Sequence, residues 1–227
     1  MGAATTVEIA DARPSLLLVP LGSTEQHGPH LPLDTDSRIA KAWAERLAAL
    51  HPSAVVAPVV DYGSSGEHQS FPGTLSIGHA ALHGLVLELV RSAAHTFSAT
   101  VFVCGHGGNA VPVLAAVEQA RSEGHRATVL LPRWSDLDGI DIDAHAGRTE
   151  TSILLHLCPD EVRLDLAAAG ATEPLSELMD DLATAGMEAV SASGVLGDPT
   201  GASPAEGARL LDDLVARSRS SIADLWP

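Results

Sequence analysis

Short apolar runs alternate with amphipathic stretches along most of this chain, and this alternation constrains the fold more than any other feature. The runs are continuously apolar, which is typical of parallel strands that helices cover on both faces. We therefore expect an α/β fold, with residues 1–227 forming a single doubly wound domain whose sheet is mainly parallel and has helices on both faces. The expected strands are residues 15–20, 54–60, 100–105 and 127–132. The expected helices are roughly residues 37–50, 80–97, 111–124 and 149–157. A last helix should start at a capping box in residues 203–206 and end near Leu225.

The composition agrees with this fold and excludes several kinds of partner. Apolar residues make up 45% of the chain but aromatic residues only 3%, so aliphatic side chains must fill the core. A formal net charge of −16 should repel nucleic acid and anionic membrane surfaces. The two cysteines, Cys104 and Cys158, do not resemble a disulfide framework, and no charged start precedes an apolar leader. We expect a cytoplasmic protein.

Unusual polar residues follow the expected strands. In doubly wound sheets, functional groups gather in the loops at the carboxyl ends of the strands. The loops at residues 21–36, 61–78, 105–109 and 133–150 hold most of the chain's clustered His, Asp and Glu side chains. These loops should therefore meet at one functional site.

The first of these loops reads STEQHGPHLPLDTD and is rich in metal-type ligands. Glu25 and His27 are two residues apart, so in an extended segment both side chains project to the same side. Asp36 follows where the first long helix should begin. A plainer role is open for Asp34, Thr35 or Asp36, because each of them could serve as the N-cap of that helix.

Two later motifs add possible ligands. In CGHGGNA, His106 leaves a buried strand among glycines, which allow close approach to a phosphate, to a crowded metal centre or simply within a tight turn. In DAHAGRTETS, His145 and Glu150 are five residues apart across a glycine bend. Glu150 alone could be a surface carboxylate that the helix dipole favours.

The number of candidate ligands favours two metal ions over one. Three carboxylates and two imidazoles, from Glu25, His27, Asp36, His106 and Glu150, are too many for one catalytic zinc with an open position. With one bridging carboxylate they would serve two divalent ions about 3.5–4 Å apart, and Zn, Mn and Fe(II) all suit this donor set. Such a centre hydrolyses amides by hydroxide attack on the carbonyl. His145 is left to protonate the departing amine.

The sequence lacks the motifs of the competing hydrolase and nucleotide-binding classes. The segment YGSSGEH is not a G-x-S-x-G elbow, and neither H-E-x-x-H, a P-loop nor a dinucleotide-binding G-x-G-x-x-G in a strand-to-helix context is present. A serine hydrolase is therefore not expected.

Four separated motifs together resemble the creatininase family of amidohydrolases. They are GSTEQHGPHLPLDTD, GSSGEHQSFPGTLSI, GHGGN and HAGRTETS, and the resemblance covers residues 17–207. The amino-acid sequences of these motifs are most similar to those of one branch of this family. That branch trims a radical-modified precursor peptide during the biosynthesis of a peptide-derived cofactor. The resemblance implies a creatininase-like fold, a two-metal centre and a homo-oligomer.

By this resemblance Asp36 bridges the two metals. Glu25 and His106 complete the set of one ion, and His27 and Glu150 that of the other. Creatininase itself has a ligand Glu two residues after the histidine that corresponds to His106, a place that Gly108 takes here, and we give the vacancy to Glu150. The tryptophan-rich substrate loop of creatininase is also not evident, because only Trp134 lies near His145, so creatinine is a poor substrate candidate.

Four further residues are expected at the edge of the site. Glu67 and His68 match a family motif beside the active site, and they either hydrogen-bond the substrate or support their loop. His30 is expected behind the ligands and not among them. Arg148 either binds a substrate carboxylate in bidentate fashion or forms a plain salt bridge.

Three functional hypotheses follow. The first is a metal-dependent peptide-bond hydrolase that releases the modified C-terminal dipeptide from a precursor peptide. The second is a hydrolase of a small cyclic amide or formamide. The third is a metal-bound sensor or scaffold without turnover, which the complete ligand set disfavours because burying carboxylates without a metal is costly.

Overall fold

The computed structural model describes residues 1–132 and 143–225, without the side chain of Asp224. Within these residues, four parallel strands form one sheet in the order β2-β1-β3-β4. They are β1 (Leu16–Leu21), β2 (Ala54–Val56), β3 (Ala99–Cys104) and β4 (Ala127–Leu130). Leu16 of β1 is in register with Ala54 of β2 and Ala99 of β3. The expected α/β fold with a parallel sheet is confirmed.

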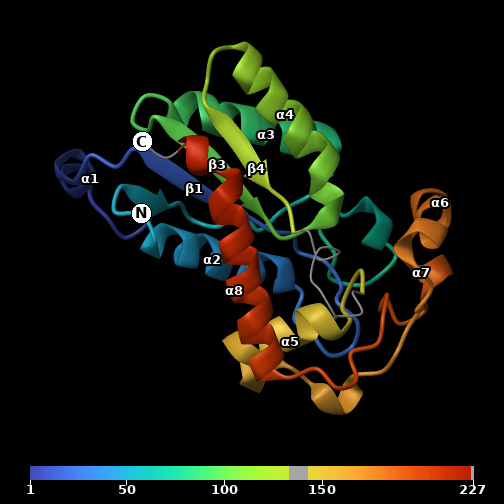
Figure 1. The fold of residues 1–227 in the computed structure, drawn as a ribbon. Coiled ribbons are helices and arrows are strands. Elements are labelled where there is room, and N and C mark those ends of the chain that lie inside the picture. Colours follow the sequence, from blue (N-terminus) through green and yellow to red (C-terminus); the bar gives the residue numbers. More distant parts are fainter. Residues whose placement is uncertain (133–142, 226–227) are drawn as a thin grey trace.

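Helices cover both faces of this sheet, as Figure 1 shows. On one face, α3 (Gly78–Ala93) and α4 (Ala110–Ser122) pack against alternate residues of β1, such as Leu17 and Val19. On the other face, α2 (Thr35–Ala49) and α8 (Pro204–Ser221) pack against the intervening residues, such as Leu16 and Leu18. The continuous apolarity of β1 thus follows from a core on each side.

The remaining helices lie outside these two layers. Helix α5 (Arg148–Leu157) shares a third apolar cluster with the start of α2 and with α8. Helices α1 (Thr6–Ala12), α6 (Leu175–Ala185) and α7 (Met187–Val190) have almost no buried residues. Short 3-10 turns complete the described elements: η1 (Gly66–His68), η2 (Gly107–Asn109), η4 (Pro159–Glu161), η5 (Leu164–Leu166) and η6 (Ala223–Leu225).

The local predictions for β2 and for the start of α8 differ from the structure. Strand β2 ends at Val56 and not at residue 60, because Pro58 has no N–H group for the ladder, although Val60 still bridges to Leu21. The expected capping box of α8 is only half formed. The Ser203 hydroxyl accepts from the Glu206 backbone N–H, but the Glu206 carboxylate binds Arg148 and Ser152 and leaves the Ser203 N–H to the Ser152 hydroxyl.

No helix among the described residues is both long and apolar enough to cross a lipid bilayer.

Candidate metal centre

The predicted ligands meet at the carboxyl ends of β1 and β3. From β1 the chain passes to β2 on one side and later returns to β3 on the other, so the strand order reverses between them. Open α/β sheets bind their ligands at such a switch point. The loop after β1 carries Glu25 and His27, the first turn of α2 carries Asp36, the loop after β3 carries His106, and the first turn of α5 carries Glu150.

These five side chains form two groups that share Asp36. In the first group, Nδ1 of His106 lies 3.1 Å from Oε1 of Glu25 and 3.5 Å from Oδ2 of Asp36. In the second, Nε2 of His27 lies 3.2 Å from Oδ1 of Asp36 and 3.9 Å from Oε2 of Glu150. Within each group the ligand atoms all lie within 4.8 Å of one another. Each oxygen of Asp36 therefore faces a different group.

Backbone carbonyls fix which nitrogen of each imidazole faces the centre. The Nδ1–H of His27 donates to the carbonyl oxygen of Glu25 over 3.1 Å, which turns Nε2 inward. The Nε2–H of His106 donates to the carbonyl oxygen of Ser64 over 3.1 Å, which turns Nδ1 inward. Hydrogen bonds to the outer nitrogen are the usual way in which proteins orient metal-binding histidines.

Three oxygens of the inner carboxylates accept no hydrogen bond from the residues that the structure describes. Both oxygens of Glu25 and Oδ2 of Asp36 are buried, and none of them accepts a hydrogen bond of good geometry from the described residues. Burying such groups without compensation is costly. Cations between the two groups would compensate all three oxygens, and a set of carboxylates and imidazoles without a thiolate fits Zn, Mn or Fe(II).

Without a metal, the clustered charges perturb these groups strongly. Burial alone would lower the pKa of His27, but the negative charges of Asp36 and Glu150 raise it to about 10. Burial likewise opposes protonation of His106, yet Glu25 and Asp36 raise the pKa of this imidazole to about 10. Burial raises the pKa of Glu150 to about 7 against the attraction of His27. In the metal-free protein, protons take the place that cations would occupy.

His145 lies against both groups and forms a further set of possible ligands with Glu25 and His27. Its ring centroid is 4.4 Å from that of His27, and its Nδ1 is 3.8 Å from Oε1 of Glu25. Burial and the positive charge of His27 lower the pKa of His145 well below its usual value. His145 is therefore neutral near neutral pH, and its Nδ1 is directed at the centre.

The turn between His145 and Glu150 differs in detail from the expected glycine bend. Ala146, not Gly147, has the left-handed backbone, with a φ of 52°. The N–H of Ala146 donates to Oε2 of Glu150 over 2.7 Å, which holds that carboxylate toward His27. Glycine is needed at position 147 for space, since a Cβ there would overlap the Asp143 carboxylate. Trp134 and the rest of residues 133–142 in this loop lie outside the described residues.

Asp34, Thr35 and Asp36 have different roles at the start of α2. Asp34 occupies the N-cap position but makes no capping hydrogen bond, because its carboxylate binds Nε of Arg38 at 2.7 Å. The Thr35 hydroxyl donates to the carbonyl oxygen of Pro32. Asp36 points into the centre and does not cap the helix.

Glu67 and His68 flank the centre on its outer side. Oε1 of Glu67 lies 3.6 Å from Nε2 of His106, the nitrogen that faces away from the ligand groups, and the Glu67 side chain is 30% exposed. It lies over Gly108, where a Cβ would come within 2.5 Å of this oxygen. His68 is buried, with Nε2 3.5 Å from Oε1 of Glu25. Gly108 thus gives Glu67 room beside His106.

His30 and Arg148 lie outside both ligand groups. Nε2 of buried His30 is hydrogen-bonded to the hydroxyl of Thr151 at 2.8 Å, directly after Glu150. Arg148 pairs with Glu206 at 2.8 Å, as the salt-bridge alternative requires, and its side chain is 46% exposed.

The sequence did not identify three residues that organise these loops. The side chain of Asn109 accepts from the N–H of Ser64 and donates to the carbonyl oxygen of Gly22, which joins three of the loops. Asp143 accepts from the N–H of Thr149 and thereby caps α5. Gln26 contacts two histidines. Asn109 ends the GHGGN motif and Gln26 separates two ligands, so proximity in sequence was the available signal.

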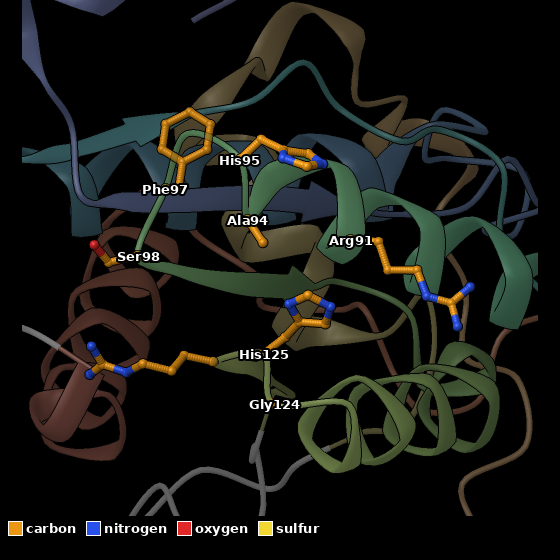
Figure 2. Close-up of a pocket in the computed structure, with 8 residues that line it drawn as sticks. Arg91, Ala94, His95, Phe97, Ser98, Gly124 and His125 are labelled. Atoms are coloured by element: carbon orange, nitrogen blue, oxygen red, sulfur yellow. The ribbon is translucent and has the colours of Figure 1, made fainter.

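A surface hollow outlined by the structure lies elsewhere. Figure 2 shows this hollow, of about 730 Å³, around residues that precede β3 and β4, at the opposite end of the strands from the ligands. Arg91, which lines it, is paired with Glu88 and Glu123. None of the predicted site residues lines this hollow.

The chain is similar to known proteins over nearly its whole length. The sequence pattern of the creatininase family, described as creatinine amidohydrolase, matches residues 3–222. A protein named mycofactocin precursor peptide peptidase, from Mycolicibacterium smegmatis, is 50% identical over 220 residues, which cover 95% of this chain and 87% of the relative. Creatinine amidohydrolase from Pseudomonas putida is 32% identical over 180 residues, which cover 66% of this chain and 67% of that protein.

Solved structures of creatininase have the same fold. A tryptophan-to-phenylalanine mutant has a TM-score of 0.84 at 28% identity, with 100% of this chain and 98% of that one covered. A glutamate-to-glutamine mutant titled as the Zn-Zn type has a TM-score of 0.80 at 27% identity, and a structure titled creatininase Mn has 0.77 at 27%, both with 100% and 98% coverage. Their titles name the metals for which the ligand groups here are suited. With the family pattern over almost all of its length and the same fold in solved members, the chain belongs to the creatininase family.

Proposed function

We propose that this protein is a metal-dependent amide hydrolase that cleaves a peptide bond of the mycofactocin precursor peptide and releases its modified C-terminal dipeptide. We infer this substrate from the 50% identity, over 95% of the chain, to a mycofactocin precursor peptide peptidase. The observation that supports the chemistry is the pair of ligand groups around Asp36. We assign this activity to residues 1–227 acting as one domain in the cytoplasm, where the free thiols of Cys104 and Cys158 would stay reduced.

Glu25, Asp36 and His106 would hold one divalent ion, and His27, Asp36 and Glu150 the other. Bound there, such ions would polarise the amide carbonyl and lower the pKa of the attacking water. Glu150 supplies the carboxylate that creatininase has at the position of Gly108. Glu67 is not a substitute, because it faces the outer nitrogen of His106.

We assign to His145 the transfer of the proton from the attacking water to the departing amine. Its Nε2–H donates to the carbonyl oxygen of Gln26 over 2.8 Å, so Nδ1 carries the free lone pair and faces the centre. Nδ1 takes the proton from the attacking water and returns it to the departing amine nitrogen. The lowered pKa of this imidazole keeps the lone pair available at neutral pH.

We assign the roles of Glu67, His30 and Arg148, at the edge of the site, from their solvent exposure and hydrogen-bond partners. Glu67 is the partly exposed carboxylate beside the centre, and we assign it contact with the substrate. His30 supports Glu150 through Thr151. Arg148 would reach a substrate carboxylate only by leaving Glu206.

The decisive experiment compares substrates on metal-reconstituted protein. The modified precursor peptide, the unmodified precursor peptide and creatinine are incubated separately, and the products are identified by mass. We expect release of a dipeptide from the modified precursor. Turnover of creatinine alone would favour the small cyclic amide as substrate, and no turnover of any substrate by metal-loaded protein would favour the non-catalytic sensor or scaffold.

A further inference from the structure

Gln26 lies between two proposed ligands in the sequence and is itself buried. Two backbone groups fix the orientation of its side-chain amide. Oε1 accepts from the N–H of Gly28 over 2.9 Å, and Nε2 donates to the carbonyl oxygen of Gly194 over 3.0 Å. The opposite orientation would place an NH2 group against an N–H group and two carbonyl oxygens against each other. The amide therefore has a single orientation.

The backbone carbonyl of Gln26 determines the orientation of His145. Nε2 of His145 lies 2.8 Å from this oxygen, and a carbonyl oxygen can only accept, so Nε2 must carry the proton. Nε2 of His145 also lies 3.1 Å from Nε2 of Gln26. Since both nitrogens are then donors, that second contact is not a hydrogen bond. The amide proton of Gln26 remains free for another acceptor.

That acceptor is His68. Nδ1 of His68 lies 2.8 Å from Nε2 of Gln26, an atom that can only donate, so Nδ1 is unprotonated. The proton of neutral His68 is therefore on Nε2, which faces the centre at 3.5 Å from Oε1 of Glu25 and 3.9 Å from Oε1 of Glu67. Because Nδ1 accepts the hydrogen bond from Gln26, the His68 ring carries one proton and is neutral.

We propose that Gln26 is a positioning residue that holds the two imidazoles in opposite orientations, so that His145 presents an Nδ1 lone pair and His68 an Nε2–H group to the same centre. The ring centroids of the two histidines are 4.5 Å apart, so both act on one reaction site. His68 is the hydrogen-bond donor for the scissile carbonyl oxygen as negative charge develops on it. This functional half of the inference rests on the proposed hydrolase activity, whereas the orientation of the imidazoles does not.

The orientation is tested in metal-free protein without any assay of activity. Two-bond ¹H–¹⁵N correlation spectra of histidine-labelled protein report which ring nitrogen carries the proton, and His68→Gln and His145→Gln identify the two signals among the 11 histidines. We expect both His68 and His145 to carry the proton on Nε2. A proton on Nδ1 of His68 in the wild-type protein would overturn the inference.

Two substitutions of Gln26 separate the two histidines. Gln26→Glu replaces the amide donor by a carboxylate, so His68 should move its proton to Nδ1. Gln26→Met removes the donor at similar size and should give a measurable Nδ1–H population. His145 should keep its Nε2–H in both variants, because its acceptor is the backbone carbonyl of residue 26. An unchanged His68 signal in both variants would refute the role of Gln26.

The functional half is read from the kinetics of the reconstituted variants. In both, kcat on the precursor peptide should fall about 10²-fold, the usual effect of losing one donor to a developing oxyanion, with KM nearly unchanged. Gln119→Glu on the exposed face of α4 controls for the added charge and should match wild type. Wild-type kcat in both Gln26 variants would exclude the donor role. An inactive wild-type protein would instead refute the proposed function and leave the spectra as the test of Gln26.

Discussion

Oδ1 of Asp36 lies 3.2 Å from Nε2 of His27, and both side chains are almost completely buried. Asp36 turns its other oxygen to His106, so one carboxylate joins two groups of possible metal ligands. The behaviour of the whole centre should therefore depend on this residue.

We expect about two transition-metal ions per chain in the purified, reconstituted protein. Asp36→Asn should reduce the occupancy of both ions and lower activity by orders of magnitude. Asp34→Asn is the matched control, because Asp34 binds Arg38 outside the centre and should leave the metal content nearly unchanged. Elemental analysis measures both, and full activity with one ion or none would contradict the two-metal assignment.

His145→Ala should keep the fold and the metals but lose about 10²–10⁴ in turnover, the usual contribution of general acid–base catalysis. Metal content, melting temperature and turnover of this one variant distinguish three roles. Loss of metal would make His145 a ligand. A lower melting temperature with preserved turnover at low temperature would make it only a structural support of its loop.

The stability of the metal-free protein should fall at alkaline pH. Folding raises the pKa of His27 from 6.5 to about 10, and that of His106 by the same amount, so both bind protons more tightly in the folded state. Their contribution to stability is fully present below pH 6.5 and is lost as the pH rises through about 10. Denaturant unfolding at several pH values measures this loss. Metal-loaded protein should not show it, because the ions replace these protons.

Gly108→Ala should destabilise the loop after β3 by about 1–3 kcal/mol, the usual cost of overpacking. The new Cβ would lie 2.5 Å from Nε2 of His106 and 2.6 Å from the carbonyl oxygen of Ser64, so the hydrogen bond between them must shift. The Gly108→Ala variant should also retain less metal than the wild-type protein. Gly107→Ala is the control, since its Cβ would meet nothing within 4 Å. Equal unfolding free energies for the two variants would show that the crowding at Gly108 is unimportant.

A closed homo-oligomer is expected from membership of the creatininase family. Light scattering at micromolar concentration measures the mass directly against the 23.4 kDa of one chain. A monomer at that concentration would contradict the expectation.

The sequence predicted the strands and long helices because each has a core partner. Runs such as β1 and β3 are apolar on both faces, and the structure buries both faces. Helix α1 was not predicted because it buries no residue, and it depends instead on a local capping box between Thr5 and Glu8. Helix α6 likewise buries no residue, so little tertiary packing reinforces its apolar stripe.

The ligand candidates could be found in the sequence because His, Asp and Glu stood together in the loops after strand ends. Proximity to these motifs marked Gln26 and Asn109 as neighbours of the ligands, but their positioning roles could not be predicted, since those roles depend on single hydrogen bonds across the fold. Gln26 reaches Gly194, and Asn109 reaches Gly22, over separations that no local pattern records. The polarity of a side chain shows that it needs a partner, but only the folded backbone shows which partner it has.

Helix α8 contributes no ligand, yet it lies directly behind α5. The backbone of Gly207 is so close to the carbonyl of Ser152 that a methyl group there would overlap it, and Glu206 reaches across to the Ser152 hydroxyl. Glu150, two residues before Ser152 on α5, is therefore set in place by residues more than fifty positions later in the chain. Selection for catalysis should accordingly restrict the C-terminal helix as strictly as the loops. The positions that tolerate substitution should then depend on this contact between α5 and α8, and not only on distance from the proposed metal centre.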